Sequence, residues 1–313
     1  MALTLLLMKK IIAMLIWAIT GFILVRAGIL KTEESKTIST LLIYALMPCM
    51  IVRAFIIDLT ADKMKSFLFG IAFAFAVMCI WILFTSLIRK PLKLTPIDQA
   101  TLCYTNCGNL IIPLVSMIFG EEYVFYVAAF QVVFNLFVWT HAVILLRGTD
   151  AVNLKKILFT PNLIAITIGI LLMLSGIQIP DIIDTAASGF SSMVGPGSML
   201  VVGMTIGSSD LGAVFRFKKA YLITIARLIL YPLLIMVLLY VSGIFKIYPA
   251  FISDVQISIL CVLAPSATLI AQFGVLYDKE PYNASAYNIM TTICCIVTIP
   301  LMFRLFQLMF PTV

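Results

Sequence analysis

Apolar stretches of about 20 residues, the length of a transmembrane helix, recur ten times along the chain and constrain its fold more than any other feature. Charged residues make up only 11% of the 313 residues, and the mean hydropathy is +1.15. This composition excludes a water-soluble globule. We therefore predict an all-α polytopic membrane protein, whose ten transmembrane helices cover residues 9–29, 37–57, 66–88, 98–118, 122–146, 159–178, 188–208, 218–241, 254–275 and 284–308.

The basic residues predict the orientation of these helices. Lys and Arg number 21 against 14 Asp and Glu, which gives a net charge of +7. Thirteen of the basic residues lie in connections that follow odd-numbered helices, and six lie on the opposite side. Because cytoplasmic loops carry the excess of Lys and Arg, we predict a multi-pass protein of the cell (plasma) membrane with both termini outside. The lipid bilayer, rather than nucleic acid, then accounts for the positive charge.

Residues for metal or hydrolytic chemistry are missing from the predicted helices. The seven cysteines form no CxxC pair, and His141 is the only histidine, so the sequence predicts no metal site. No Asp or Glu occurs near the middle of a predicted helix, and no Ser, His and Asp set appears. We therefore predict that the protein is not an enzyme, and that it lacks the carboxylate relay of many proton-driven pumps.

Glycine and proline positions repeat between the two halves of the sequence. The ten helices divide into two sets of five, at about residues 1–150 and 151–313, and an odd number per set makes the second set insert upside down. Inverted repeats of this kind are typical of secondary transporters, whereas chance matches among glycine-rich helices are the alternative. The matched pairs are Gly21 and Gly169, Gly28 and Gly176, and Pro48 and Pro196, each 148 residues apart, and Pro113 and Pro265, which are 152 apart.

The fourth and ninth predicted helices each contain a proline well inside the span. Pro113 cannot bond the carbonyl of Asn109, Gly108 adds local freedom, and Pro265 interrupts the ninth helix in the same way. Non-helical backbone inside a membrane is tolerated only where it is buried in protein or lines a wet cavity. We predict that both helices break, that their second halves begin near the prolines, and that the broken helices meet at the membrane midplane. Simple kinks are the alternative.

Neutral polar residues gather around both prolines and define a candidate substrate site. A helix N-terminus carries about half a positive charge and free N–H groups, which suits a carboxylate. The C-terminal carbonyls of the first halves could instead hold a cation such as sodium, and we expect no other cofactor. The candidate substrate-binding residues are Asn106, Asn109, Ser266, Thr268, Gln272, Gln131 and Asn135, with Asn288 as a minor candidate.

Two basic side chains inside the predicted helices are candidate charge partners of an anion. Arg227 lies eight residues past Lys219, about 12 Å along the helix. We expect it to snorkel to the cytoplasmic face or to form a structural pair, rather than to meet an anion inside. His141 shares roughly one helical face with Gln131 and Asn135, where hydrogen bonds between helices are an equal alternative.

Three short motifs lie in the fourth, seventh and ninth helices. They are Asn106-Cys-Gly-Asn-Leu-Ile-Ile-Pro113, Gly203-Met-Thr-Ile-Gly207 and Ala264-Pro-Ser-Ala-Thr268. The first resembles the Asn-x-Gly-x-x-Gly-x-Pro signature of the auxin efflux carrier family of membrane transporters. The other two resemble that family's small-residue run and its Ala-Pro stretch. Ile111 stands where the family usually has glycine, and the connection between helices 5 and 6 is short, which indicates a compact, prokaryotic-type member.

The resemblance implies a fold shared with bile acid–sodium symporters. Helices 1, 2, 6 and 7 would form a scaffold that makes a homodimer, and helices 3–5 and 8–10 would form a mobile core. The core would carry small organic anions by an elevator-type movement. The residues that the resemblance places at the crossover are Asn106, Asn109, Pro113, Pro265 and Ser266.

Three functions remain open from the sequence. The first is a secondary transporter that exports a small organic carboxylate, driven by the membrane potential or by weak ion coupling. The second is a sodium- or proton-coupled organic anion symporter on the same fold, and the third is a membrane sensor that binds a ligand without moving it. Because the sequence places no carboxylate near the middle of a predicted helix, we favour the first.

Overall fold

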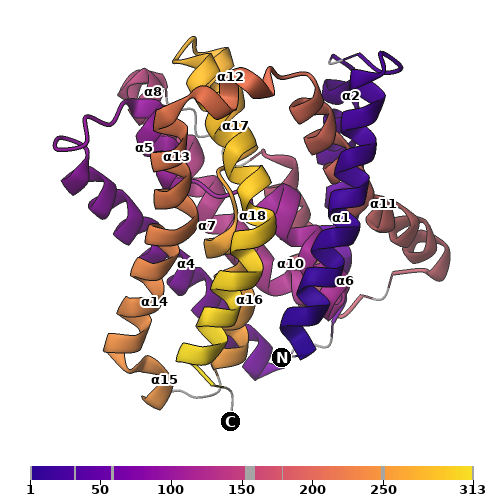
Figure 1. The fold of residues 1–313 in the computed structure, drawn as a ribbon. Helices are drawn as coiled ribbons and strands as arrows, with labels where there is room; N and C mark the ends of the chain where they lie inside the picture. The colour runs from indigo at the N-terminus through magenta and orange to yellow at the C-terminus, as the bar shows by residue number, and fades with distance from the viewer. Residues whose placement is uncertain are drawn as a thin grey trace. The chain divides into compact units, whose positions relative to one another are not determined.

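The chain is helical throughout the part that the structure describes (Figure 1). The computed structural model describes residues 2–31, 33–57, 60–151, 159–177, 179–247 and 251–311. Within these ranges there is no β-strand, only an isolated antiparallel bridge between Thr105 and Ser266. The predicted all-α fold is therefore confirmed.

Seven helices among the described residues are long and apolar enough to cross a membrane. They cover Leu5–Arg26, Glu34–Ala54, Ala61–Ile88, Glu121–Arg147, Asp181–Gly207, Lys218–Ser242 and Pro281–Met309. The other three predicted spans are a 15-residue helix, Pro161–Ser175, and two helices that are each built in two parts. The multi-pass character is thus confirmed, whereas the arrangement of ten spans as an inverted repeat stays a prediction.

The helices fall into two compact units, each assembled from separate stretches of the chain. Each unit contains segments from both predicted repeats. The division into repeats at about residue 150, and that into scaffold and core, remain predictions. Unit 1 comprises Met1–Phe67, Gly108–Ala128 and Lys155–Asp210, and unit 2 comprises Leu68–Cys107, Ala129–Leu154 and Leu211–Val313.

Unit 1 is built around α1 and α11, which pack along each other. The matched glycines Gly28 and Gly176 both adopt left-handed conformations, with φ of 72° and 64°, just after α1 and α10. The elements of unit 1 are α1 (Ala2–Arg26), α2 (Glu34–Leu41), η1 (Leu42–Leu46), α3 (Met47–Ala54), α6 (Ile112–Phe119), η3 (Glu121–Tyr123), α10 (Pro161–Ser175) and α11 (Asp181–Gly207). The elements η2 (Cys107–Ile111), α4 (Ala61–Ile88) and α7 (Val124–Phe137) run from one unit into the other.

Two glycines let the backbones of α1 and α11 touch. A Cβ atom on Gly21 of α1 would collide with the carbonyl oxygen of Leu200, and one on Gly203 of α11 would collide with that of Ala18. Small residues permit this kind of close approach between membrane helices, where dispersion contacts rather than exclusion of water hold helices together. The small-residue run that begins at Gly203 is therefore a packing surface for α1.

Charged side chains join three elements of unit 1. Arg53, near the end of α3, forms ion pairs with Glu121 of η3 and with Asp184 of α11, the second with 2.8 Å between Nε and Oδ1. The hydroxyl of Ser191 in α11 donates to Glu121 at 2.8 Å. These contacts tie the connection that follows α6 to both α3 and α11.

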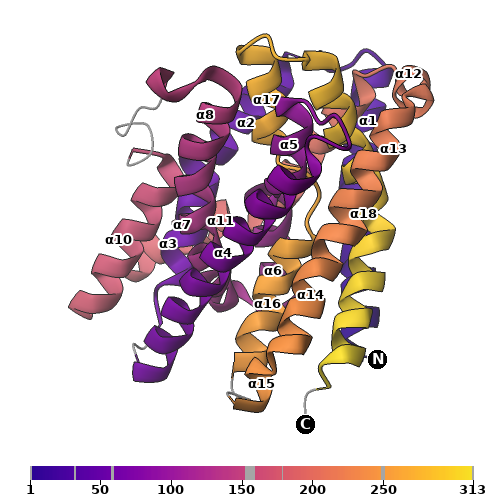
Figure 2. The same ribbon diagram turned by 90° about the vertical axis from the view of Figure 1, so that its left-hand side faces the viewer.

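Unit 2 contains the remaining helices. Within it, α13, η6 and α14 form one continuous rod that packs along α18 (Figure 2). Besides most of α4 and α7, its elements are α5 (Pro96–Cys103), η4 (Val138–Ala142), α8 (Val143–Arg147), η5 (Thr149–Ala151), α12 (Leu211–Arg216), α13 (Lys218–Ile225), η6 (Ala226–Leu230), α14 (Tyr231–Ser242), α15 (Ile244–Ile247), α16 (Phe251–Leu263), α17 (Thr268–Leu276) and α18 (Pro281–Met309).

Three of the prolines follow a π-helical turn. Pro48, Pro113 and Pro232 are each the second residue of an α-helix that continues directly from η1, η2 or η6. A proline cannot bond the carbonyl four residues earlier, and its ring crowds that carbonyl. In each case that carbonyl lies inside the wider π turn, which shifts the hydrogen-bond pattern. These helices therefore continue through their prolines instead of breaking there.

We expect Gly203→Ala to destabilise the protein because the new methyl group would meet the Ala18 carbonyl. Overpacking of this kind costs about 1–3 kcal/mol. At Gly189 of the same helix a Cβ atom meets nothing within 4 Å, so Gly189→Ala is the matched control. It should gain up to about 1 kcal/mol from helix propensity. Thermal unfolding in detergent measures both variants, and equal stability of the two would contradict the contact.

Candidate functional site

Two interrupted helices of unit 2 meet through their backbones. α5 ends at Cys103 and helix resumes at Cys107, while α16 ends at Leu263 and α17 begins at Thr268. The N–H of Asn106 donates to the carbonyl of Pro265, and the N–H of Ala267 donates to that of Tyr104, both at 2.9 Å. We call the two extended segments, Tyr104–Asn106 and Ala264–Ala267, the crossing.

The two breaks arise differently. Pro265 lies inside its break, as predicted, because it lacks an N–H and biases Ala264 toward an extended conformation. The prediction that the other second half begins near Pro113 is wrong, because helix already resumes at Cys107 and Pro113 sits in the first turn of α6. No proline lies in Tyr104–Asn106. That segment is held extended by its two hydrogen bonds to the opposite segment.

The start of α5 is fixed by a buried carboxylate. Asp98 and Thr95 form a capping box, in which each side chain accepts from the backbone N–H of the other. The carboxylate of Asp98 also accepts from the hydroxyl of Tyr287 at 2.8 Å and pairs with Lys219 at 2.5 Å. These contacts anchor α5 to α13 and α18, and so set where the helix reaches the crossing.

Arg227 binds the C-terminal ends of both first half-helices. Its Nη1 donates to the carbonyl of Leu102 in α5 at 3.1 Å. Its Nη2 donates to the carbonyls of Val262 and Ala264, at 3.1 and 3.0 Å. The side chain is 0% exposed, so of the two predicted outcomes snorkelling to the membrane surface is wrong, and Arg227 instead has a structural role through backbone carbonyls. One guanidinium thus satisfies carbonyls that two broken helices leave without helical partners.

The position of Arg227 depends on its own helix and on one aromatic ring. It lies in the π turn η6, which is wider than an α-helical turn. The guanidinium carbon stands 4.4 Å from the ring centre of Trp81, a cation–π contact. The indole of Trp81 donates to the carbonyl of Tyr231, one turn beyond Arg227, at 3.3 Å. Ring and guanidinium therefore hold each other in place.

Two further groups of polar side chains surround the crossing in unit 2. On one side the Asn106 amide donates to the hydroxyl of Thr268 at 3.1 Å. On the other side, Ser266 is bound by α18. The Asn288 amide donates to its carbonyl at 2.9 Å, and its hydroxyl lies 2.9 Å from that of Thr291.

A third group leads from the crossing into α7. The thiol of Cys107 donates to the Gln131 side-chain oxygen at 3.2 Å, and the Gln131 amide donates to the Asn135 oxygen at 3.4 Å. Gln131 and Asn135 are both buried. His141, six residues beyond Asn135, contacts Tyr104 instead, with 2.8 Å between its Nδ1 and the Tyr104 hydroxyl.

Three buried polar atoms in this region have no hydrogen-bond partner among the described residues. They are Nδ2 of Asn135, Nε of Arg227 and Oγ1 of Thr105. The first two are donors only, and an unsatisfied buried donor costs about 1–3 kcal/mol. A ligand with acceptor oxygens that reached these donors would remove this cost.

Six carbonyls at or next to the crossing already accept hydrogen bonds, which makes these six poor ligands for a sodium ion. Those of Leu102, Val262 and Ala264 accept from Arg227, and those of Tyr104 and Pro265 accept from backbone N–H groups. The Ser266 carbonyl accepts from Asn288. Sodium needs several oxygens free of donors, and a neighbouring guanidinium would repel it.

The remaining predicted residues, as far as the structure describes them, take part in none of these side-chain hydrogen bonds. Gly108, Asn109 and Pro113 follow directly in the chain and belong to unit 1. Gln272, one turn beyond Thr268, is exposed on α17. Sequence reasoning missed Thr105 and Thr291, and gave Asn288 only a minor place. The three-residue spacing of Asn288 and Thr291 on one face of the last helix was the available signal.

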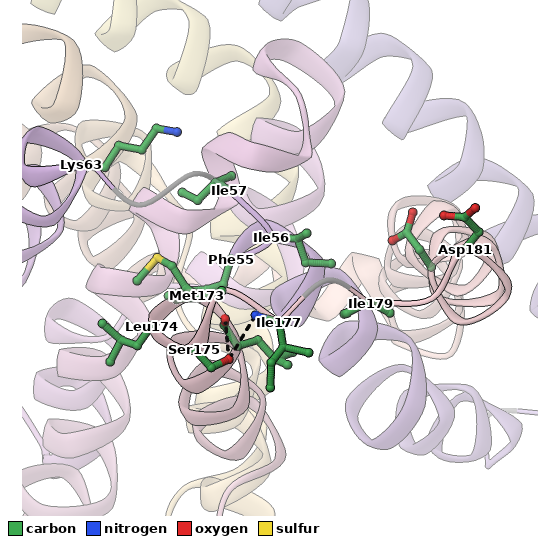
Figure 3. Close-up of a pocket in the computed structure, with 13 residues that line it drawn as sticks. Phe55, Ile56, Ile57, Lys63, Met173, Leu174, Ser175, Ile177, Ile179 and Asp181 are labelled. Atoms are coloured by element: carbon green, nitrogen blue, oxygen red, sulfur yellow. Dashed lines mark hydrogen bonds between the residues drawn. The ribbon is translucent and has the colours of Figure 1, made fainter.

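A cavity of about 840 Å³ lies in unit 1, between the end of α3 and the segment that joins α10 to α11 (Figure 3). Among its lining residues, Asp184 binds Arg53 and Ser175 is bonded within its own turn. The Ser175 hydroxyl donates to the Leu172 carbonyl at 3.0 Å and accepts from the Ile177 N–H at 3.4 Å. In Figure 3, Lys63 and Asp181 lie at opposite ends of the cavity. Without convergent free donors, the cavity is a weaker candidate than the crossing.

Comparison with protein families decides what kind of protein this is. The family model described as "membrane transport protein" matches residues 6–153 and 147–303. The chain belongs to this family. The match confirms the resemblance to the auxin efflux carriers, and the protein is thus a membrane transporter whose broken helices meet at the crossing. No curated protein matches the transporter in sequence.

Two asparagines of the transporter should respond differently to replacement by leucine. Asn288→Leu removes the donor to the Ser266 carbonyl, and should lower stability by about 1–3 kcal/mol because that carbonyl stays buried and unpaired. Asn135→Leu removes an amide whose Nδ2 has no partner among the described residues and whose oxygen accepts only a long hydrogen bond of 3.4 Å from Gln131, so it should lower stability less than Asn288→Leu does. Thermal unfolding of the purified variants measures both. Equal destabilisation would contradict the distinction between an amide that donates a buried hydrogen bond and one that does not.

Proposed function

We propose that this transporter exports a small organic anion, such as a carboxylate, across the plasma membrane by an elevator-type movement. One observation carries the proposal, namely that Asn135 and Arg227 bury donors that lack acceptors within the described chain. Asn135 connects to the crossing through Gln131 and Cys107, and Arg227 binds it directly. An anion supplies oxygen acceptors to both kinds of donor.

The charges around the crossing support an anion rather than a cation. Asp98 is the acidic residue of α5, and it is already paired with Lys219 and Tyr287. The N-terminus of α17 begins at the crossing, at Thr268, and brings about half a positive charge. Arg227 offsets the partial negative charge of the two helix ends that it binds, so the field that remains, from the N-terminus of α17, favours a negatively charged ligand.

The membrane potential is a sufficient driving force for export. A monoanion that leaves a negative interior gains about 2.3 kcal/mol for each 100 mV. Export therefore needs no carboxylate relay and no bound coupling ion. The same proposal includes three further features. Both termini lie outside the cell, the protein forms a homodimer, and an inverted repeat places the crossing at the membrane midplane.

Efflux from proteoliposomes tests this function. Vesicles loaded with labelled mono- or dicarboxylates should lose label faster when a potassium diffusion potential makes the interior negative. Asn135→Leu should slow the efflux about tenfold, which corresponds to the loss of about 1.4 kcal/mol. Asn283→Ala is the control, because the Asn283 amide serves only the neighbouring Glu280 carboxylate at 2.7 Å.

Each other outcome of the efflux experiment points to a different function. An efflux rate that is the same with and without the imposed voltage contradicts potential-driven export. Uptake that requires sodium or a proton gradient indicates a coupled symporter, and saturable binding without flux indicates a sensor.

The elevator movement would have to open the charge cluster of unit 1. Arg53 and Asp184 belong to α3 and α11, which the proposal assigns to the stationary scaffold. Glu121 follows α6, which the proposal assigns to the mobile core, yet it pairs with Arg53 and accepts from Ser191. We propose that these contacts hold one end state of the cycle and are exchanged in the other.

Cross-linking distinguishes the two pairs that Arg53 makes. A short bifunctional thiol reagent that joins Arg53→Cys to Glu121→Cys should stop efflux, because it ties core to scaffold. Joining Arg53→Cys to Asp184→Cys is the matched control and should leave efflux intact, because both residues belong to the scaffold. The background should lack the three native cysteines that are not buried, Cys49, Cys79 and Cys294. Full efflux through the first cross-linked pair would exclude the movement.

A further inference from the structure

We propose that the guanidinium of Arg227 is a permanent positive charge at the crossing, and that it takes the place of a bound coupling cation. The inference rests on the proposed anion transport but concerns how the broken helices are held and neutralised. Arg227 is thereby a positioning residue, which keeps the two extended segments in place and leaves the donors around them available to an anion.

The electrostatic balance at the ends of α5 and α16 supports this role. The C-terminal end of a helix carries about half a negative charge, so two such ends bring together about one. The guanidinium bonds carbonyls from both ends, at Leu102 in α5 and at Val262 in α16, and also at Ala264 in the extended segment. One permanent positive charge therefore balances two helix ends that would otherwise repel each other inside the protein.

The groups that the Arg227 guanidinium contacts also support the inference. Among the described residues it forms no ion pair with a carboxylate, although it is fully buried. A buried arginine normally needs such a partner to offset the loss of hydration. Here three carbonyls and the face of Trp81 take that place. These are the ligands that a desolvated monovalent cation would use, and the arginine already occupies them.

An arginine is better suited to this position than a mobile ion. It cannot be deprotonated under physiological conditions, and its planar fork reaches carbonyls in different directions. It is covalently attached, so it cannot leave with the substrate. A crossing neutralised in this way would carry the anion without the stoichiometric movement of sodium.

The wild-type protein provides the first test. Its thermal unfolding temperature should be the same in sodium chloride and in choline chloride at equal ionic strength. Stabilisation specific to sodium would overturn the proposal, because it would show that the crossing or another site still takes a cation. This measurement needs no variant and no substrate.

Three variants separate the charge of Arg227 from its packing. Arg227→Met keeps much of the apolar stem without charge and should lower the unfolding temperature by about 10 °C, as expected when one partner of a buried polar network is lost. Arg227→Lys keeps the charge and should retain most of the stability. Arg227→Ala leaves a cavity, and guanidinium chloride at a low, non-denaturing concentration should restore its stability, whereas choline chloride should not.

The outcomes decide the proposal even when one variant fails to fold. Equal stability of Arg227→Met and the wild type would show a packing role and overturn the inference, as would Arg227→Ala that guanidinium does not rescue. If neither neutral variant folds, hydrogen exchange of residues 102–106 and 262–267 in Arg227→Lys decides. Slow exchange, close to the wild type, is expected, and complete loss of protection would show that shape rather than charge matters. Because all these readouts measure stability, they can fail while anion efflux succeeds, and the reverse.

Discussion

A carbonyl that loses its helical partner inside a lipid bilayer cannot turn to water, so every interrupted helix needs donors from elsewhere in the protein. In unit 2 those donors come from a small number of groups. Arg227 supplies three of the hydrogen bonds, Asn288 supplies one, and the N–H groups of Asn106 and Ala267 supply the two that join the extended segments. The breaks can exist only because these donors converge on them. Much of the surrounding structure, from the ring of Trp81 to the packing of α18, keeps the donors in position.

Four prolines of this chain act in two distinct ways. Pro265 lies in an extended segment and separates α16 from α17. Pro48, Pro113 and Pro232 instead sit at the second position of an α-helix that follows a π turn, where the missing N–H is tolerated. The π turn η6 also carries Arg227, so the same local distortion that accommodates Pro232 helps to aim the arginine inward. Backbone irregularity and function are therefore linked in that helix.

Hydropathy alone predicted the helical fold because the bilayer imposes a length and an apolar composition that few other structures share. The proline inside the ninth predicted span also predicted the break at Pro265, since the cause of that break is local. The break at Tyr104–Asn106 could not be found in the same way, because it depends on hydrogen bonds to residues far along the chain. The burial of the Arg227 side chain could not be predicted from the sequence either. Its distance from the helix end is visible in the sequence, but the side toward which it points depends on the phase shift of η6.

The candidate site was predicted in part for the same reasons. Asn106, Ser266 and Thr268 flank the breaks, and the structure brings them to the crossing. Gln131 and Asn135 join through Cys107. Asn288 and Thr291 were recognised as part of the site only from the tertiary packing of their helix. No proline lies close to them in the sequence, so no local pattern marks this polar face. Residues that bind a break from a neighbouring helix leave little trace in local sequence patterns.

The contact between α1 and α11 has a mechanical consequence within unit 1. The Ala18 carbonyl occupies the space that a side chain on Gly203 would fill, and the Leu200 carbonyl does the same at Gly21. Sliding either helix lengthwise by one residue would press a carbonyl against a Cβ atom. The two helices therefore resist sliding along each other and should move as one rigid body. Any relative sliding of helices during transport has to take place at another helix–helix contact.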